Sequence, residues 1–145
     1  ANEAQYLLIN RASANSLNKV LKAKYAANGI DFSHEQYSTS DWLIERFRPN
    51  IVIDGSDELP FEEDAFKKLT TSANNIEFQV SGKCNRCSMI CVDTVSLTRV
   101  EEPLQTLSEF RRERASVYFG MLLSANVSEQ GVASLSVNTK LLATF

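Results

Sequence analysis

The apolar residues of this chain come in short runs, and this pattern restricts the fold more than any other feature of the sequence. Residues 7–9, 51–53 and 121–123 are such runs, and each is far shorter than the ~20 residues of a membrane-spanning helix. Runs of this length are typical of short strands. Strands and helices do not alternate regularly along the chain, so a doubly wound parallel sheet is not expected. The sequence therefore predicts a mainly β, α+β fold, most simply a distorted barrel with several short helices.

Two helices are expected in the first third of the chain. Apolar residues spaced by three and four positions around Leu17 predict the first helix, which Ser13 or Asn15 would cap. The second helix is expected over residues 42–47. Pro49 would stop it, because the residue before a proline avoids helical backbone angles.

The remaining elements follow from alternation and turn signals. Residues 62–69 have the pattern of a short amphipathic helix, and Pro103 predicts a helix over 104–111. Asn138 is expected in a turn that needs a positive φ, which asparagine tolerates. The expected strands are 6–10, 51–53, 76–80, 88–93, 117–127, 132–137 and 141–145.

The charge of the chain argues against one broad class of function. The formal net charge is −3, so the chain lacks the cationic surface of a general nucleic-acid-binding protein. Six acidic residues fall within residues 54–64 with no basic residue among them. We interpret this segment as a solvated acidic loop rather than as a cation site.

The beginning of the sequence shows no targeting signal. The chain starts at Ala1, and its methionines are Met89 and Met121. No basic stretch followed by an apolar core precedes the first predicted strand, so a secretory signal peptide is not expected. We expect this sequence to be a piece of a longer protein.

All three cysteines lie within residues 84–91, and Cys84 and Cys87 have the C-x-x-C spacing. A structural zinc site would need His34 as its fourth ligand. A thioredoxin-like redox pair would need the motif at the start of a helix in a βαβ unit, whereas strands are expected here. A single thiolate that binds a metal or a sulfur atom is the third alternative. Simple packing of three small buried side chains is as well supported as any functional interpretation.

The third alternative singles out one thiol. If a strand runs through the segment, Cys87, Met89 and Cys91 share one face. Lys83 and Arg86 place positive charge beside Cys87, which suits a thiolate.

A second group of candidate binding residues lies around Phe47. Arg46 and Arg48 flank this phenylalanine, and alternation puts both arginines on one side if the segment is extended. Guanidinium forks match phosphate oxygens, but the pattern alone favours surface ion pairs with the acidic loop. The basic residues of 111–114 are interpreted as a solvated helix end.

Taken together, these segments resemble the MOSC domain family, and within it the C-terminal domains of molybdenum cofactor sulfurases. The matching segments follow the family's order over nearly the whole chain. The run Cys-x-Arg-Cys-x-Met-Ile-Cys-x-Asp points to the sulfurases more than to the related amidoxime-reducing proteins. The resemblance is carried by Tyr-Leu-Leu-Ile-Asn (6–10), Arg-Phe-Arg-Pro-Asn-Ile (46–51), Phe-Glu-Glu-Asp (61–64), residues 84–93, Glu-Pro-Leu-Gln-Thr-Leu (102–107) and Tyr-Phe-Gly (118–120).

The resemblance implies a MOSC-type β-barrel with helical decorations over residues 1–145. It implies that a small β-barrel subdomain and a pyridoxal-phosphate domain, which extracts sulfur from cysteine, precede this segment in the whole protein. The implied cofactor of the MOSC domain itself is the molybdenum cofactor (Mo-molybdopterin), whose Mo=O group is converted to Mo=S. Xanthine dehydrogenase and aldehyde oxidase are the implied recipients.

The resemblance also assigns roles to individual residues. Cys87 matches the molybdenum ligand of the amidoxime-reducing relatives, which implies that it is the metal-binding and catalytic thiol. Arg48 and Asn50 would contact the phosphate and pterin, and Arg86 the dithiolene side. The implied cofactor-binding set is Asn10, Ser13, Arg48, Asn50, Arg86 and Cys87.

The leading hypothesis is therefore a cofactor-binding, sulfur-accepting module that works as part of a sulfurtransferase. One alternative is an amidoxime-reductase-like module in which molybdenum itself removes oxygen from N-hydroxylated substrates. Another is a docking module for the target molybdoenzymes, with structural cysteines. A cytoplasmic location is expected, with no nucleic acid and no membrane as partner.

Overall fold

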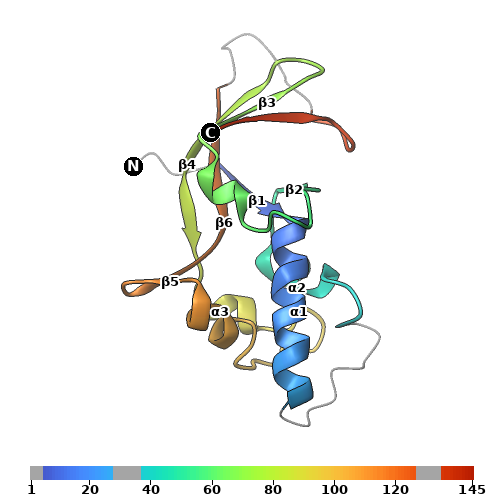
Figure 1. Cartoon of the computed structure of the whole chain (residues 1–145), viewed down its shortest axis with the longest axis vertical. Coiled ribbons are helices and arrows are strands. Elements are labelled where there is room, and N and C mark those ends of the chain that lie inside the picture. Colours follow the sequence, from blue (N-terminus) through green and yellow to red (C-terminus); the bar gives the residue numbers. More distant parts are fainter. Residues whose placement is uncertain (1–4, 28–36, 127–134) are drawn as a thin grey trace.

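The structure, a computed structural model, describes residues 5–27, 37–126 and 135–145. Within these residues seven strands form one curled mixed sheet that closes about half of a barrel (Figure 1). The strand order is β2-β1-β6-β4-β3-β7, with β5 beside β6; β1 and β2 are parallel and the other pairs antiparallel. The strands are β1 (Tyr6–Asn10), β2 (Ile51–Ile53), β3 (Lys68–Thr71), β4 (Glu77–Asn85), β5 (Arg112–Glu113), β6 (Ser116–Asn126) and β7 (Leu141–Thr144).

The helices gather at one end of the sheet. Figure 1 shows α1, α2 and α3 in the lower half of the view, and β3 and β7 in the upper part. In the described ranges, no helix combines the length and the apolarity that crossing a membrane requires. The expected mainly β fold with short helices is confirmed. The helices are α1 (Arg11–Ala27), α2 (Asp41–Phe47) and α3 (Leu104–Phe110), with single 3₁₀ turns η2 (Glu62–Ala65) and η3 (Ser88–Cys91).

Two separate cores hold these elements together. Leu8 and Ile9 are neighbours on β1, so they point to opposite faces of the sheet and bury in different clusters. The cluster on the helical side is the larger, and α1, α2, η3 and α3 all contribute to it. Its buried members are Ile9, Ala14, Leu17, Leu21, Leu43, Phe47, Ile90, Cys91, Leu107, Val117 and Phe119. The second cluster consists of Leu8, Phe66, Leu69, Phe78, Met121 and Leu123.

The close approach of β6 to β1, its antiparallel neighbour, requires a glycine. Gly120 has a φ of +83°, and a Cβ there would lie 2.6 Å from the Ile9 Cδ1 and 2.9 Å from the Leu8 carbonyl oxygen. Only glycine combines a positive φ with so close an approach. Phe119 before it packs in the helical core and Met121 after it in the second core. Gly120 therefore lies where β6 passes from one core to the other.

The first predicted helix exists, but its predicted cap is wrong. The chain passes directly from β1 into α1 at Arg11, so Ser13 and Asn15 lie inside the helix. Asn10, the last residue of the strand, accepts a hydrogen bond from the Ala12 N–H at its Oδ1 (3.1 Å) and takes the capping role.

Two further predictions in the middle of the chain are wrong. Residues 62–69 form a single 3₁₀ turn followed by β3, which pairs with both β4 and β7. Residues 88–93 are not a strand, because β4 continues to Asn85 and the chain then enters η3. Register shifts near Gly82 and Lys83 let β4 extend beyond the alternation that the sequence displays.

Other predictions are confirmed to within a residue. β1, β2, α2, β6, α3 and β7 occupy the expected segments, and Asn138 has a φ of 65°. Of the strand expected over 132–137, residues 132–134 lie outside the described ranges and 135–137 are not in a strand.

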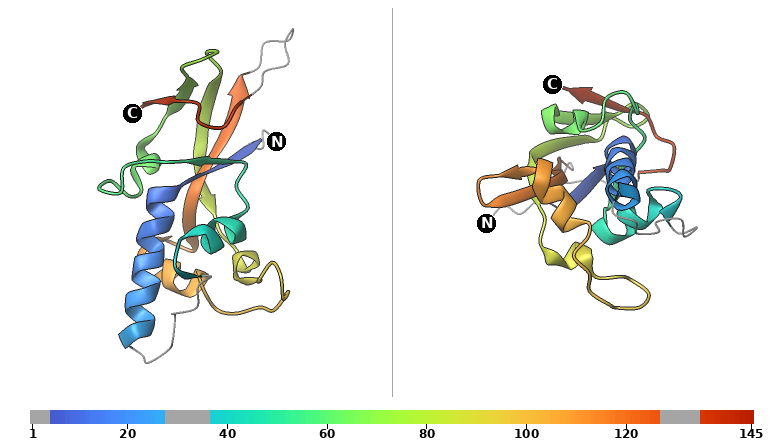
Figure 2. Two further views of the ribbon diagram at one scale, coloured as in Figure 1. Left: turned by 90° about the vertical axis from the view of Figure 1, so that its right-hand side faces the viewer. Right: turned by 60° about the horizontal axis from the view of Figure 1, so that its bottom comes forward.

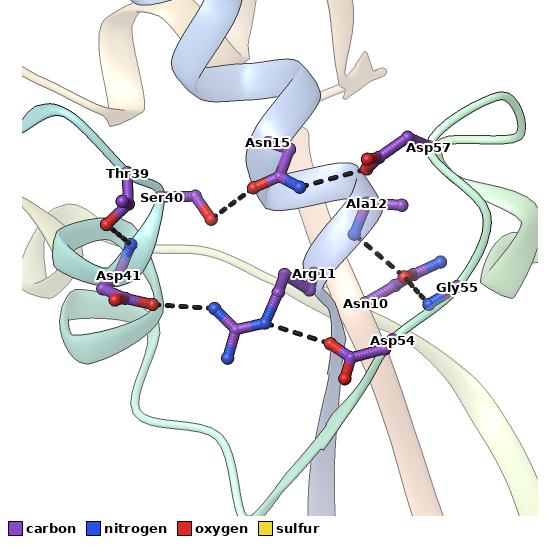
Figure 3. A network of polar contacts seen from close by, with 10 residues as sticks. All are labelled: Asn10, Arg11, Ala12, Asn15, Thr39, Ser40, Asp41, Asp54, Gly55 and Asp57. Carbon is purple, nitrogen blue, oxygen red and sulfur yellow. Dashed lines mark hydrogen bonds and ion pairs between the residues drawn. The ribbon is translucent and has the colours of Figure 1, made fainter.

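A network of polar contacts ties α1 to its surroundings (Figure 3). The Arg11 guanidinium donates to Asp41 Oδ1 (2.7 Å) at the start of α2 and to Asp54 Oδ1 (3.0 Å) after β2. Asn15, one turn further along α1, donates to Asp57 (3.0 Å) in the same loop. These carboxylates raise the pKa of Arg11, chiefly through the hydrogen bond that Arg11 donates to Asp41. The network ties the start of α1 to the start of α2 and to the loop after β2.

Candidate functional site

An open cleft of about 210 Å³ lies where the end of α2 meets the end of β4 and the start of η3. It joins the Arg-Phe-Arg segment to the cysteine segment, which are some forty positions apart in the sequence. The figures show that the two segments lie at the helical end of the sheet (Figures 1 and 2). The residues lining the cleft are Arg46, Phe47, Arg48, Asn85, Arg86, Cys87, Met89 and Ile90.

The first wall of the cleft is set by the end of α2. Pro49 ends the helix as predicted, and Arg48 takes left-handed angles (φ 53°, ψ 54°) while its N–H still donates to the Ile44 carbonyl (3.1 Å). Such angles cost a residue with a Cβ roughly 1–2 kcal/mol. The Arg48 side chain is exposed and has no hydrogen bond or ion pair with any residue that the structure describes. Its guanidinium is therefore free to bind an anion in the cleft.

Arg86 connects the second wall of the cleft, formed by the end of β4 and the start of η3, to the first wall. Its Nη2 donates to the Phe47 carbonyl (2.9 Å), its Nη1 donates to the Cys84 sulfur (3.2 Å), and the guanidinium lies over the Phe47 ring at 5.0 Å. Phe47 in turn stacks on Phe119 of β6, with ring centroids 4.4 Å apart. Arg86 thus fixes the position of its neighbour Cys87 relative to the end of α2.

The three cysteines have three different environments. Cys87 is exposed in the cleft, Cys84 is half-buried against Arg86, and Cys91 is buried in the helical core. The prediction that Cys87, Met89 and Cys91 share a face is wrong, because η3 replaces the expected strand and turns Cys91 inward while Met89 stays 61% exposed. Burial raises the pKa of the Cys91 thiol, which donates to the Glu101 carbonyl (3.3 Å).

The zinc alternative finds no support in the described ranges. Among residues 5–27, 37–126 and 135–145, no group of three or more histidine, cysteine or acidic side chains is arranged to hold a metal ion. His34, the predicted fourth ligand, lies outside these residues. Lys83, expected beside Cys87, forms an ion pair with Glu113 instead.

Arg46 differs from Arg48 although the sequence places them symmetrically. Its side chain is only 8% exposed, and it donates to Asp93 Oδ2 (3.2 Å) and to the Glu102 carbonyl (3.2 Å). The guanidinium also lies 5.2 Å from the centre of the Trp42 ring. The expected ion pair with the acidic loop is wrong, because the partner of Arg46 is the aspartate that ends the cysteine motif. The sequence alone gives no sign of this role of Asp93.

Asn10 and Ser13 lie elsewhere, in a buried network around Glu63. Asn10 Nδ2 donates to one Glu63 oxygen (3.0 Å) and Ser13 Oγ to the other (2.6 Å). The remaining atoms are also used: Asn10 Oδ1 accepts from the Gly55 N–H (3.1 Å), and Ser13 Oγ from the Phe61 N–H (2.8 Å). None of these residues lines the cleft.

This network corrects the interpretation of the acidic segment. Glu63 is completely buried, and burial raises its pKa although the bonds from Ser13 and Asn10 oppose the shift. Its neighbour Asp64 forms a two-pronged ion pair with Arg111 (2.8 and 3.0 Å), whose side chain is only 13% exposed. The segment is thus not a simple solvated loop, and Arg111 is not part of a solvated helix end.

Asn50 also lies outside the cleft. Its Oδ1 accepts from the Leu7 N–H (2.8 Å), and its own N–H donates to the Leu7 carbonyl (2.9 Å). Asn50 thereby holds the entrance of β2 against β1. The structure brings Arg48, Arg86 and Cys87 together, and it leaves Asn10, Ser13 and Asn50 in other surroundings.

Comparison with known proteins shows which proteins this chain is similar to. The MOSC domain family matches residues 1–140. A molybdenum cofactor sulfurase of Danio rerio is 43% identical over 123 residues, which is 85% of this chain and 14% of that protein. The sulfurase of Bos taurus is 39% identical over 97% of this chain, and that of Arabidopsis thaliana 37% over 90%. The chain spans only about 15% of the length of either.

Proposed function

Because the chain belongs to the MOSC domain family, we propose that it is the cofactor-binding, sulfur-accepting module of a molybdenum cofactor sulfurase. The observation that supports the proposal is an open cleft in which the exposed Cys87 lies beside Arg48 and Arg86. The molybdenum cofactor is an anionic pterin with a phosphate and a dithiolene-bound metal. A soft thiolate and guanidinium groups that form no ion pair within the described residues are fitting donors for such a molecule.

Each residue of the cleft has a separate task in this proposal. Arg48 binds an anionic part of the cofactor, because its guanidinium has no partner in the described residues. Arg86, held at both Nη atoms, presents its remaining N–H groups in a fixed direction. Cys87 supplies the sulfur ligand. When bound, the cofactor supplies the Mo=O group that is exchanged for Mo=S.

Cys87 also accepts sulfur in this proposal. Its thiolate attacks the outer sulfur of a donor persulfide, the S–S bond of the donor breaks, and the donor leaves as a thiolate. Cys87 then carries the persulfide, and the step needs no outside oxidant or reductant. The exposure of Cys87 permits such an approach, whereas burial of Cys91 prevents it.

The other implied residues receive supporting roles. We assign Asn10, Ser13 and Asn50 to holding α1, the loop before η2 and β2 in place, since their hydrogen bonds are made within the chain. The donor, a pyridoxal-phosphate desulfurase domain, the recipients xanthine dehydrogenase and aldehyde oxidase, and a cytoplasmic location belong to the same proposal.

Sulfur loading on the three cysteines tests the proposal. The purified chain is incubated with cysteine persulfide, and intact-mass and peptide mass spectrometry locate the added sulfur atom. We expect sulfur on Cys87, loss of loading in Cys87→Ser, and loading retained in Cys84→Ser. Cys91→Ser should act through stability, because it places a hydroxyl in an apolar core. Loading that survives in Cys87→Ser contradicts the assignment.

One observation favours docking of a partner protein as a second function. Val95 and Leu97 are 90% and 75% exposed on one turn, and Val95 lines a second cleft that shares Arg46 with the first. The turn is held by Asp93, and Leu97 has a positive φ of 59°. A protein that exchanges cofactor with the cleft would contact this apolar turn. Val95→Asp should then weaken activation of the recipient enzyme without changing sulfur loading on Cys87; equal activation would argue against docking.

A further inference from the structure

Arg46 lies in the wall between two clefts. The second cleft, of about 220 Å³, adjoins the first, and Arg46 is the residue that lines both. Arg48 and Arg86 line only the first cleft. The position of Arg46 would allow it to be a third anion-binding guanidinium, provided that no carboxylate of the chain already balances its charge.

The charge of Arg46 is balanced within the chain. Its Nη2 lies 3.2 Å from Asp93 Oδ2, and its Nη1 is occupied by the Glu102 carbonyl. By contrast, no carboxylate in the described ranges forms an ion pair with Arg48 or Arg86. Two of the three guanidinium charges at the cleft are therefore uncompensated.

The carboxylate that balances Arg46 is itself firmly held. Asp93 Oδ1 accepts from the N–H groups of Ser96 (2.7 Å) and Val95 (3.0 Å) and from the Ser96 hydroxyl (3.0 Å). These bonds, led by the one from the Ser96 N–H, lower the pKa of Asp93 to about 2. Asp93 therefore stays negative at any physiological pH, and it compensates Arg46 permanently rather than as a switch.

We infer that Asp93 determines the anion specificity of the cleft, because it neutralises Arg46 and leaves two guanidinium charges for the bound group. The inference rests on the proposed function in taking the cleft as an anion site. Two positive charges match a phosphate monoester, which carries about −1.5 to −2 at neutral pH. A third free guanidinium would strengthen binding of phosphate, and would favour more highly charged anions such as diphosphate.

Inorganic phosphate is the probe. It is titrated into the whole chain at constant ionic strength and neutral pH, with binding followed by calorimetry or by NMR of the arginine side chains. We expect Asp93→Asn to bind phosphate about tenfold more tightly, which corresponds to one added charge-assisted hydrogen bond. Asp93→Asn should increase the affinity for inorganic diphosphate by a larger factor than the affinity for phosphate. Asp93→Glu, which keeps the negative charge, should bind phosphate with nearly the same affinity as the unaltered chain.

A matched control separates the local effect from net charge. Asp54→Asn makes the same change in charge, but Asp54 pairs with Arg11 at the network of Figure 3 rather than at the cleft. Its phosphate affinity should stay within about twofold of the unaltered chain. The double variant Arg46→Gln/Asp93→Asn should return to the affinity of the unaltered chain, because the unmasked guanidinium is gone.

Several outcomes overturn the inference. The first is an Asp93→Asn variant that is folded, as judged by circular dichroism, but binds phosphate no more tightly than the unaltered chain. The second is a double variant that binds phosphate as tightly as Asp93→Asn does. If Asp93→Asn unfolds in phosphate-free buffer, recovery of its fold on adding phosphate supports the inference, and no recovery overturns it. Failure of Cys87 to accept sulfur counts against the proposed function alone, since this test uses neither sulfur nor cofactor.

Discussion

The cleft and the buried network around Glu63 are two polar regions that use their hydrogen-bonding groups in opposite ways. Around Glu63, each carboxylate oxygen has a side-chain donor, and Asn10 and Ser13 are at most 1% exposed. No buried side-chain nitrogen or oxygen of the described ranges lacks a partner. In the cleft, Arg48 and Cys87 are exposed and make no such bonds within those ranges.

The contrast separates support from binding. Buried polar groups that satisfy one another fix the position of a backbone, and removing one leaves the others unsatisfied. Charged groups that are accessible and unsatisfied within the chain can instead bind an external molecule at little cost to the fold. Both regions contain residues that the family resemblance assigns to the cofactor, so substitutions in each can test the distinction.

The largest expected effect is in the buried network. Glu63→Ala removes the acceptor of both Asn10 and Ser13 and leaves a cavity, so we expect a loss of about 3 kcal/mol in the free energy of unfolding. Urea denaturation measures it. Glu62→Ala, at the half-buried neighbouring position, is the control and should change stability by no more than about 0.5 kcal/mol. A loss below about 1 kcal/mol for Glu63→Ala would show that the network is not a support.

The second effect belongs to the cleft and should leave stability untouched. Arg48→Ala should weaken cofactor binding by about 1.5–3 kcal/mol, the range of a charge-assisted hydrogen bond. The free energy of unfolding should change by no more than about 0.5 kcal/mol, because the side chain is exposed. Arg48→Lys should restore only part of the binding, since the planar fork is lost. Unchanged cofactor content after gel filtration of Arg48→Ala would remove Arg48 from the site.

Asn10→Ala and Ser13→Ala sharpen the comparison, because these residues could serve either purpose. We expect each to lower the free energy of unfolding by about 1–2 kcal/mol through the unsatisfied Glu63 oxygen and backbone N–H groups. Cofactor affinity of the folded protein should not change. Weaker cofactor binding with an unchanged free energy of unfolding would instead indicate that both residues contact the cofactor.

The smallest effects are those of pH, and they differ in sign between Glu63 and Asp93. Burial raises the pKa of Glu63 above 4.5, so the folded chain keeps this proton to higher pH than the unfolded chain does. Its contribution to stability is complete below that value and declines as pH rises through the folded pKa. Asp93, with a pKa lowered from 3.8 to about 2, contributes above 3.8 and loses this contribution as pH falls toward 2.

Unfolding experiments across pH 2 to 7 on two variants separate these contributions. Glu63→Gln should remove the decline above pH 4.5, and Asp93→Asn should remove part of the loss at acid pH. Curves that stay parallel to that of the unaltered chain would contradict the corresponding assignment.

The elements that the sequence predicted well are those whose local signals agree with their packing. The strand 6–10 and the helix 42–47 each have one apolar pattern and clear boundaries, such as Pro49. Residues 62–69 have a helical pattern, but β4 and β7 pair with residues 68–71 and override it. Local periodicity does not predict which distant segments pair with one another.

The candidate site was predicted in part for the same reason. Arg48 and Cys87 were found from their residue types, and the structure places them in one cleft. The sequence does not show that Arg46 is buried and ion-paired while Arg48 is exposed. This difference depends on a helix that ends between them and on Asp93 from another segment. Glu63 was missed because an acidic run gives no sign that one member turns inward.

The position of β6 in the sheet has a consequence for how the chain is made. β6 pairs with β1, so Tyr6 lies opposite Leu123, and it also pairs with β4 and β5. During synthesis, the first strand leaves the ribosome long before its central partner does. The hairpin of β3 and β4 and the pairing of β1 with β2 can form early, but β1 lacks its antiparallel neighbour until β6 emerges. The pairing of β6 with β1 therefore waits until most of the residues described here have been synthesised, and long-range pairing of this kind is slow.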